Sequence, residues 1–224
     1  MPYLSRHVPT YHVWMQDADL QAATASEPLT LPEEYEMQRS WRNDKDKLTF
    51  IVCLADKVVE TEVQGGYSDR SEHMIGDINL FLYEPDDEDS EDDGTHLAAA
   101  NGTKTPKAVV GEIELMIARR DLHRQGYGRA ALLLFTSYIL DSWTQISSEY
   151  SDTAGPLRPL EYLRVKINQT NDRSIALFES VGFKQTAAGP NYFGEVELRW
   201  QPDRSELERR KGWEEPRTLK YVEP

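Results

Sequence analysis

The chain has 224 residues, of which 39% are hydrophobic, and its formal net charge is −14. This negative balance repels nucleic-acid phosphates and anionic membrane surfaces, so the composition argues against a nucleic-acid or membrane partner. No apolar run approaches the roughly 20 residues that span a bilayer, and the first residues lack the apolar stretch of a signal peptide.

The cysteine and histidine content argues against two further classes of protein. Cys53 is the only cysteine, so no disulfide can form within the chain, and its apolar flanks predict a buried thiol in a strand. The histidines show no spacing typical of a metal site, so we predict no metal. These features favour a cytoplasmic protein. Nothing in the sequence indicates an obligate oligomer, so we expect a monomer.

The length suits one domain, which we place at residues 1–201, followed by a charged tail at 202–224. Polar stretches at about 56–72, 84–107 and 147–159 are interpreted as insertions into that domain. Residues 84–93 hold eight acidic residues and no basic one, which accounts for much of the net charge. The composition of 84–107 predicts disorder, because this stretch cannot bury enough apolar surface to offset the entropy of ordering it.

The N-terminal half begins with residues 12–41, which favour two short helices around a loop at 24–30. Thr30 fits an N-cap, since Pro32 and two glutamates follow in what would be the first turn. Runs rich in β-forming residues come next, at 48–55, 74–83 and 109–118. The last of these alternates, with Glu112 and Glu114 on the face opposite Ile113.

The C-terminal half places helices between strands. An apolar helix is expected at 129–143, a strand at 160–167, a helix at 171–181 that ends at Gly182, and a final hairpin from 183 and at 191–200. A short helix is expected near 205–211 in the tail. Strands with interposed helices in this order predict a mixed α/β sheet.

The turn before the helix at 129–143 is the most informative stretch of the chain. Gly126-Tyr127-Gly128 lies between a strand and a helix. The first N–H groups of a helix have no intrahelical partner and form an anion site, and glycine lets the backbone approach a phosphate. A lone G-x-G does not by itself distinguish this site from an ordinary turn. The Walker pattern is absent, and a Rossmann glycine loop would open the first strand–helix unit rather than follow several strands.

Two ordered motifs resemble the GNAT superfamily of N-acetyltransferases. The first is the strand, glycine turn and helix around Gly126, and the second is residues 168–183, which resemble N-x-x-S-I-x-L-[F/Y]-E-x-x-G-F. The resemblance implies an α/β (α+β) fold, with a mixed, mostly antiparallel central sheet flanked by helices, and acetyl-CoA as cosubstrate. The residues that it implies for cofactor binding are Met116, Ile117, Ala118, His123, Arg124, Gln125, Gly126, Tyr127, Gly128, Arg129, Asn171, Ser174 and Phe178.

Residues 24–31, 35–41, 76–82 and 111–118 further resemble the N-acetyltransferase 9 family. This resemblance implies acetylation of a protein or peptide amine, with tubulin N-termini as the target proposed for that family. The sequence departs from the pattern in three ways. His123 replaces Gln or Arg, the β-strand with which family chains usually begin is expected to be missing, and Phe178 stands where many members carry a tyrosine that protonates the departing thiolate.

Acetyl transfer also needs a base and an acid. Glu112 and Glu114 are the candidate general bases, although two solvated carboxylates on a strand would look the same in sequence. Tyr192 is the candidate acid, and Glu27 and Asn79 are candidates for the acceptor groove. An α-amine is roughly 10% neutral at pH 7, whereas a lysine amine is under about 0.1% neutral, so an N-terminal α-amine is the easier acceptor.

Two other functions remain open from the sequence. A small-amine or polyamine acetyltransferase would suit the acidic residues at 84–93. A non-enzymatic protein that binds acyl-CoA, or one that associates with microtubules, would fit the departures at His123 and Phe178.

Overall fold

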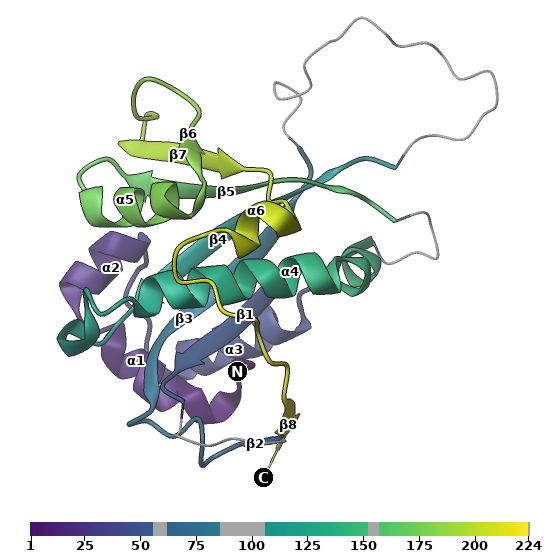
Figure 1. Cartoon of the computed structure of the whole chain (residues 1–224). Coiled ribbons are helices and arrows are strands. Elements are labelled where there is room, and N and C mark those ends of the chain that lie inside the picture. Colours follow the sequence, from purple (N-terminus) through teal and green to yellow (C-terminus); the bar gives the residue numbers. More distant parts are fainter. Residues whose placement is uncertain (56–61, 86–105, 152–156, 224) are drawn as a thin grey trace, which may run out of the picture.

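The computed structural model describes residues 1–55, 62–85, 106–151 and 157–223. Most of the acidic stretch at 84–107, whose disorder the composition predicts, lies outside these residues. A six-stranded sheet forms the centre of the fold, in the order β1-β3-β4-β5-β7-β6 (Figure 1). Its strands are β1 Lys47–Cys53, β3 Met74–Tyr83, β4 Val109–Ile117, β5 Leu160–Asn168, β6 Lys184–Gln185 and β7 Glu195–Trp200.

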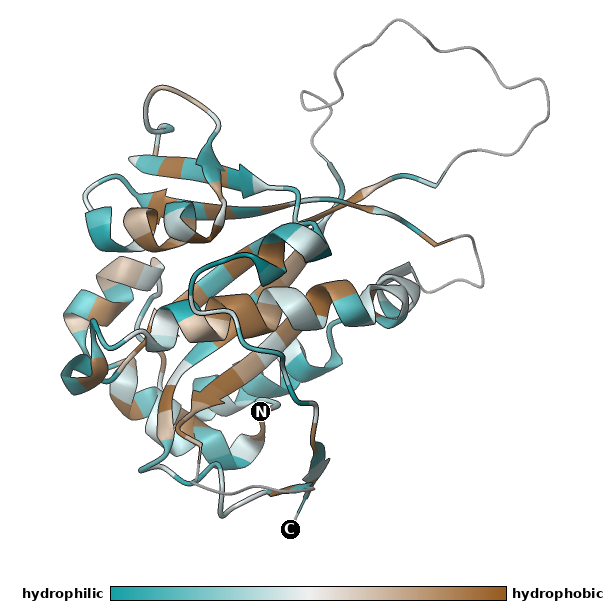
Figure 2. Cartoon of the chain, viewed as in Figure 1, coloured by the Kyte–Doolittle hydropathy of each residue, from teal (hydrophilic) through white to brown (hydrophobic). Residues whose placement is uncertain are grey.

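Successive side chains along each strand point to opposite faces of the sheet, and both faces are packed. Figure 2 shows hydrophobic residues concentrated along the strands and α4. On one face, Ile78, Ile113 and Leu163 belong to a large core that includes α4 (Tyr127–Ser151), α5 (Asp172–Val181) and Leu207 of α6 (Arg204–Glu208). On the other face, Ile51 and Met116 pack in a smaller cluster with residues of α1 (Val8–Trp14). The sheet is therefore covered on both sides.

The N-terminal helices differ from the expectation of two helices. A short 3-10 turn, η1 (Ser5–His7), leads into α1, and α2 (Ala18–Thr24) begins separately because Asp17 caps it, accepting the Asp19 N–H at 2.9 Å. The third helix, α3 (Leu31–Asn43), begins after Thr30 as predicted. The Thr30 N–H donates to the Glu33 carboxylate at 2.8 Å, which is one half of a capping box.

Residues 1–3 lie beside β1, where the sequence led us to expect a missing strand. The Tyr3 N–H donates to the Thr49 carbonyl at 3.2 Å, the Ile51 N–H donates to the Met1 carbonyl at 2.7 Å, and Pro2 forms an isolated bridge with Phe50. The edge of the sheet is therefore partly paired by a segment too short to form a regular strand.

Two further boundaries differ from the sequence interpretation. The helix α4 continues to Ser151, so the first part of the 147–159 insertion is helical. Ser147 is buried there, and its hydroxyl donates to the Arg158 carbonyl at 3.0 Å. The insertion at 56–72 includes β2 (Glu62–Gln64), which pairs in parallel with β8 (Lys220–Val222) of the tail.

The tail packs against the preceding residues. Leu207 is fully buried, and Arg204 forms an ion pair with Asp141 of α4 at 2.9 Å. At the far end, Tyr221 of β8 donates a short hydrogen bond to Asp69, which also accepts from His7 at 2.7 Å. These contacts join the two ends of the chain around one buried carboxylate.

The strands β4 and β5 position the site. They pair in parallel only from Val109 to Glu112, where Glu112 lies opposite Arg164. Beyond that point, β4 continues to Ile117 and β5 to Asn168, each paired on its outer side with β3 or β7 but no longer with the other, so the two strands diverge (Figure 1). The divergence leaves backbone groups at both inner edges available to a ligand.

Candidate active site

The glycine turn lies at the wide end of the gap between β4 and β5. Arg124 and Gly126 both have positive φ, +62° and +92°, and the Ala130 N–H donates to the Gly126 carbonyl at 2.9 Å as α4 begins. N–H groups that succeed one another through such a left-handed turn form a concave anion-binding nest, reinforced by the helix dipole. A Cβ at Gly128 would lie 3.3 Å from Leu177, so the helix start also packs closely on α5.

Several side chains that were predicted to contact the cofactor form hydrogen bonds to backbone carbonyl groups of the protein itself. The His123 ring lies 2.7 Å from the Ile117 carbonyl, and Gln125 donates to the Asp121 carbonyl at 2.7 Å. Arg129 donates to the Lys211 carbonyl at 2.7 Å. These side chains hold the turn in place, which leaves the backbone as the principal anion-binding element.

The Ile117 backbone faces the gap. The Ala118 N–H donates to the Ile75 carbonyl on β3 at 2.8 Å, so it is committed to the sheet. Since successive residues of a strand direct their N–H groups to opposite edges, the Ile117 N–H points toward β5. Of the three residues predicted on this strand, Ile117 is therefore the one whose N–H can meet a ligand carbonyl.

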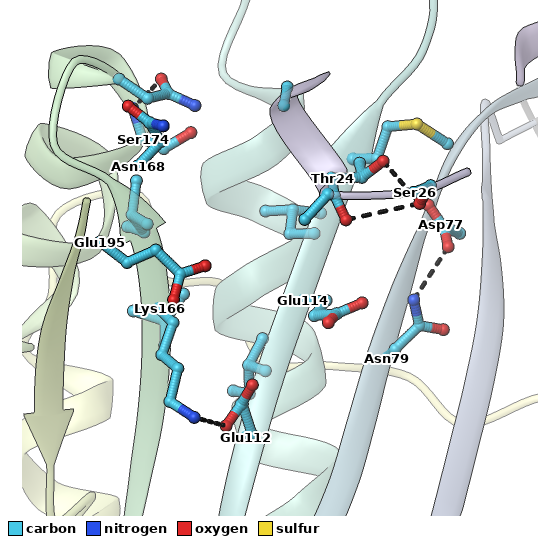
Figure 3. A pocket seen from close by; sticks show the side chains of 18 of the residues that line it. Thr24, Ser26, Asp77, Asn79, Glu112, Glu114, Lys166, Asn168, Ser174 and Glu195 are labelled. Atoms are coloured by element: carbon cyan, nitrogen blue, oxygen red, sulfur yellow. Dashed lines mark hydrogen bonds and ion pairs between the residues drawn. The ribbon is translucent and has the colours of Figure 1, made fainter. Parts of the chain in front are cut away.

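A cavity of about 370 Å³ lies where the strands diverge. Its walls come from β3, β4, β5, the start of β7, the N-terminal part of α5, residues of α1 and α3, and the end of α2 with the segment that follows it (Figure 3). Polar groups converge on it from these elements: Asp77, Asn79, Glu112, Glu114, Lys166, Asn168, Ser174 and Glu195.

Glu112 and Glu114, the predicted bases, both line the cavity but have different surroundings. Glu112 is 9% exposed and pairs with Arg164 at 2.6 Å and Lys166 at 3.4 Å. Glu114 is more exposed than Glu112, but it opens into the cavity, whose walls remove part of its hydration. This partial desolvation, with repulsion from Asp77 and Glu112, raises the pKa of Glu114 to about 7. The pKa of Glu114 therefore lies near neutral pH, where a general base works best.

Asn79 and Asp77 form the floor of the cavity. The Asn79 side-chain amide donates to the Asp77 carboxylate at 2.9 Å, and the Tyr11 hydroxyl lies 3.4 Å from the same oxygen. Burial raises the pKa of Asp77 to about 6, although these two donors favour its ionised form. Asn79, predicted for the acceptor groove, lines the cavity together with Asp77 and Tyr11, which were not predicted.

The second motif contributes to the wall near α5. Asn171 caps α5, accepting the Ser174 N–H at 3.2 Å, and both residues, which were predicted to bind the cofactor, line the cavity. Phe178 also lines it, but its ring is 3% exposed and packs edge-on against Phe183 at 5.1 Å between centroids.

Of the residues predicted for catalysis or acceptor binding, two lie outside the cavity lining. Tyr192 is 96% exposed on the loop before β7, while its neighbour Phe193 reaches the lining. Glu27 is exposed, next to Ser26, which does line the cavity. The Tyr192 hydroxyl is therefore not positioned to act within the cavity.

The residues of the site that were not predicted can be recognised only weakly from the sequence. Asp77 and Asn79 are two apart in an otherwise apolar strand, a spacing that places both on one face. Lys166 and Arg164 show the same spacing on β5. Tyr11 had no such signal, because its approach depends on how α1 packs on the sheet.

The described residues contain no group of three or more His, Cys, Asp or Glu side chains suited to hold a metal ion. In that same part of the chain, no helix is long and apolar enough to cross a membrane.

The comparisons with known proteins identify the family and the fold. A family model for the acetyltransferase (GNAT) domain matches residues 2–184. The aminoglycoside acetyltransferase AAC(6')-Ib, solved with coenzyme A, superposes with a TM-score of 0.58 at 13% identity, over 93% of this chain and 96% of that one. An acetyltransferase from Thermus thermophilus superposes with a TM-score of 0.53 at 14% identity, over 89% and 93% of the two chains. The chain belongs to the GNAT family and is an N-acetyltransferase.

Within that family, the chain is similar to N-acetyltransferase 9 proteins. The N-acetyltransferase 9-like protein of Schizosaccharomyces pombe is 42% identical over 205 residues, which cover 88% of this chain and 90% of that protein. The alpha/beta-tubulin-N-acetyltransferase 9 of Homo sapiens is 38% identical over 207 residues, which cover 92% and 81% of the two chains. The resemblance stated from the sequence is thereby confirmed.

Proposed function

We propose that the protein transfers an acetyl group from acetyl-CoA to the N-terminal α-amine of a protein, with tubulin as the first candidate. The observation that carries the proposal is the gap between β4 and β5, with an anion-binding turn at one end and an acid-lined cavity where the strands diverge. This arrangement fits a long ligand with phosphates at one end and a reactive group at the other.

The residues present fit acetyl-CoA. Backbone N–H groups from Gln125 to Arg129 would hold its pyrophosphate, because the turn and the start of α4 present unpaired donors. The inner edges of β4 and β5 would pair with its amide groups, and the Ile117 N–H would polarise the acetyl carbonyl. When bound, acetyl-CoA supplies the activated thioester, and the protein supplies orientation and proton transfer.

Glu114 is the proposed general base. A base works best when its pKa lies near the working pH, and the pKa of Glu114 is raised to about 7. Glu112 serves instead to hold Arg164 and Lys166, which keeps β4 and β5 joined just below the gap. The carboxylates that line the cavity, among them Glu114 and Glu195, also attract a cationic amine before it loses its proton.

The choice of a protein acceptor rests on the relatives whose names include alpha/beta-tubulin-N-acetyltransferase 9. The choice of the α-amine rests on acid–base chemistry, since an α-amine is more often neutral at pH 7 than a lysine amine. A small polyamine is the second candidate, because the acids Asp77, Glu114 and Glu195 in one cavity suit a polycation equally well.

Two measurements test the proposal. Calorimetric titration with acetyl-CoA should give saturable binding at micromolar strength. Turnover should then be compared between tubulin N-terminal peptides with a free α-amine, the same peptides with a blocked α-amine, and spermidine. Activity only on the free peptides supports the proposal. Activity only on spermidine would favour the polyamine alternative, and activity on blocked peptides through lysine would contradict the α-amine assignment.

A further inference from the structure

The departing CoA thiolate needs a proton, and the residues expected from the sequence do not supply it. Phe178 has no hydroxyl, and Tyr192 is 96% exposed outside the cavity. Among the described residues that line the cavity, Tyr11 is the one tyrosine. It comes from α1, on the opposite face of the sheet from the core that contains Phe178.

The position of Tyr11 suits the thioester end of the cavity. Its ring is 7% exposed and belongs to the same packed cluster as Met116. Met116 directly precedes Ile117, whose N–H faces the gap and is proposed to polarise the acetyl carbonyl. Asp77, which accepts from the Tyr11 hydroxyl, is the register partner of Met116, so this hydroxyl lies near the thioester bond that would break.

The hydroxyl of Tyr11 is also connected to the base. It donates to Asp77 at 3.4 Å, and Asn79 fixes the same carboxylate oxygen at 2.9 Å. Asp77 lies opposite Met116 and Asn79 lies opposite Glu114, so Asp77 and Glu114 are diagonal neighbours on adjacent strands. At this separation, side chains of this length interact directly or through one water molecule.

We propose that Tyr11 protonates the departing CoA thiolate and that Asp77 carries a replacement proton from Glu114 back to Tyr11. The inference rests on the proposed function. The nitrogen of the neutral amine forms a bond to the acetyl carbon, and the carbon–sulfur bond breaks with its electron pair leaving on sulfur. Glu114 takes the proton that the nitrogen loses. Tyr11 gives its proton to sulfur and regains one through Asp77, so the circuit returns to its starting state.

The decisive test removes the Tyr11 hydroxyl and then introduces a hydroxyl at position 178, on another wall of the cavity. Tyr11→Phe should lower kcat about 10–10²-fold, a modest loss because a thiol with a pKa of about 8.5 is already a good leaving group. The affinity for acetyl-CoA and the acceptor KM should stay unchanged. The double variant Tyr11→Phe with Phe178→Tyr should recover much of the lost kcat, since residue 178 also lines the cavity.

A second experiment uses variants of Asp77 and does not depend on whether the Phe178→Tyr variant folds. Asp77→Asn cannot carry a proton, so it should lower kcat, and adding Tyr11→Phe should cause little further loss because the residues act as a unit. Tyr3→Phe is the matched control. The Tyr3 ring lies in the same packed cluster, is 4% exposed, and its hydroxyl has no hydrogen-bond partner among the described residues.

The outcomes distinguish a failure of the Tyr11 assignment from a failure of the proposed function. If the natural protein acetylates peptides or spermidine and Tyr11→Phe keeps full kcat, the assignment of Tyr11 is wrong while the proposed function stands. A loss in Tyr3→Phe equal to that in Tyr11→Phe would also overturn it, as the effect would then reflect packing. If the natural protein acetylates no amine, both fail together.

Discussion

Asn79 on β3 and Glu114 on β4 lie directly opposite each other in the register of the sheet. The pair joins the floor of the cavity to the carboxylate with the raised pKa, and it places Asp77 one diagonal step away. The proposed base, its neighbouring amide and the proposed proton route thus depend on the pairing of β3 with β4, two strands that are about 25 residues apart at their closest ends in the sequence.

The first prediction concerns Glu114. Glu114→Gln should lower kcat about 10²-fold or more, because the amide cannot accept the proton of the acceptor amine. In the natural protein, kcat should fall as the pH drops below about 7, since Glu114 then becomes protonated. The variant should lose this dependence. Glu62→Gln on the exposed strand β2 is the control and should leave the profile unchanged.

Glu112 should behave differently. Glu112→Gln removes the carboxylate that pairs with buried Arg164, and breaking a buried ion pair costs about 3 kcal/mol. We therefore expect a lower free energy of unfolding, measured by urea denaturation, with the remaining folded protein still active. A stable variant that had lost its activity would instead indicate that Glu112, not Glu114, is the base.

The glycine turn gives a third prediction. Gly126→Glu should abolish acetyl-CoA binding in a calorimetric titration, because φ is +92° there and a carboxylate would repel phosphate. Gly189→Glu is the control, since a Cβ at Gly189 meets nothing within 4 Å and no positive φ is involved. Tight binding to the Gly126 variant would show that the turn does not hold the phosphates.

The turn and the second motif could be predicted from sequence because each depends on local order along the chain. Thr30, Asn171 and Gly182 are of the same kind, since a cap acts on its own helix. The roles of Asp77, Tyr11 and Lys166 depend on which strands pair and how α1 packs, and no single segment encodes that. For the same reason, the sequence left Glu112 and Glu114 equivalent, whereas Arg164 and Lys166 distinguish them in the fold.

The fourth prediction concerns the carboxylate that joins the chain ends. Burial opposes ionisation of Asp69, but hydrogen bonds from Tyr221, His7 and the Gly66 N–H outweigh it and hold the pKa of Asp69 at about 2. The stability from these bonds is complete above the unfolded pKa of 3.8 and is lost as the pH falls through about 2.

Asp69→Ala should accordingly lower the free energy of unfolding by about 3 kcal/mol at pH 7, because it leaves buried donors without their acceptor. Tyr221→Phe should cost about 1 kcal/mol. Tyr67→Phe, on a ring that is 63% exposed, should cost nothing measurable. Equal urea midpoints for Asp69→Ala and the natural protein would show that this contact does not stabilise the fold.

The most direct test of the account is to locate the acetyl group on the product. The protein is incubated with acetyl-CoA and a tubulin N-terminal peptide that also contains a lysine, and the product is fragmented by mass spectrometry. Acetyl on the α-nitrogen alone, absent in the Glu114→Gln reaction, is the predicted result. Acetyl on the lysine side chain, or no transfer by a protein that binds acetyl-CoA, would contradict the claim that this cavity acetylates an N-terminal amine.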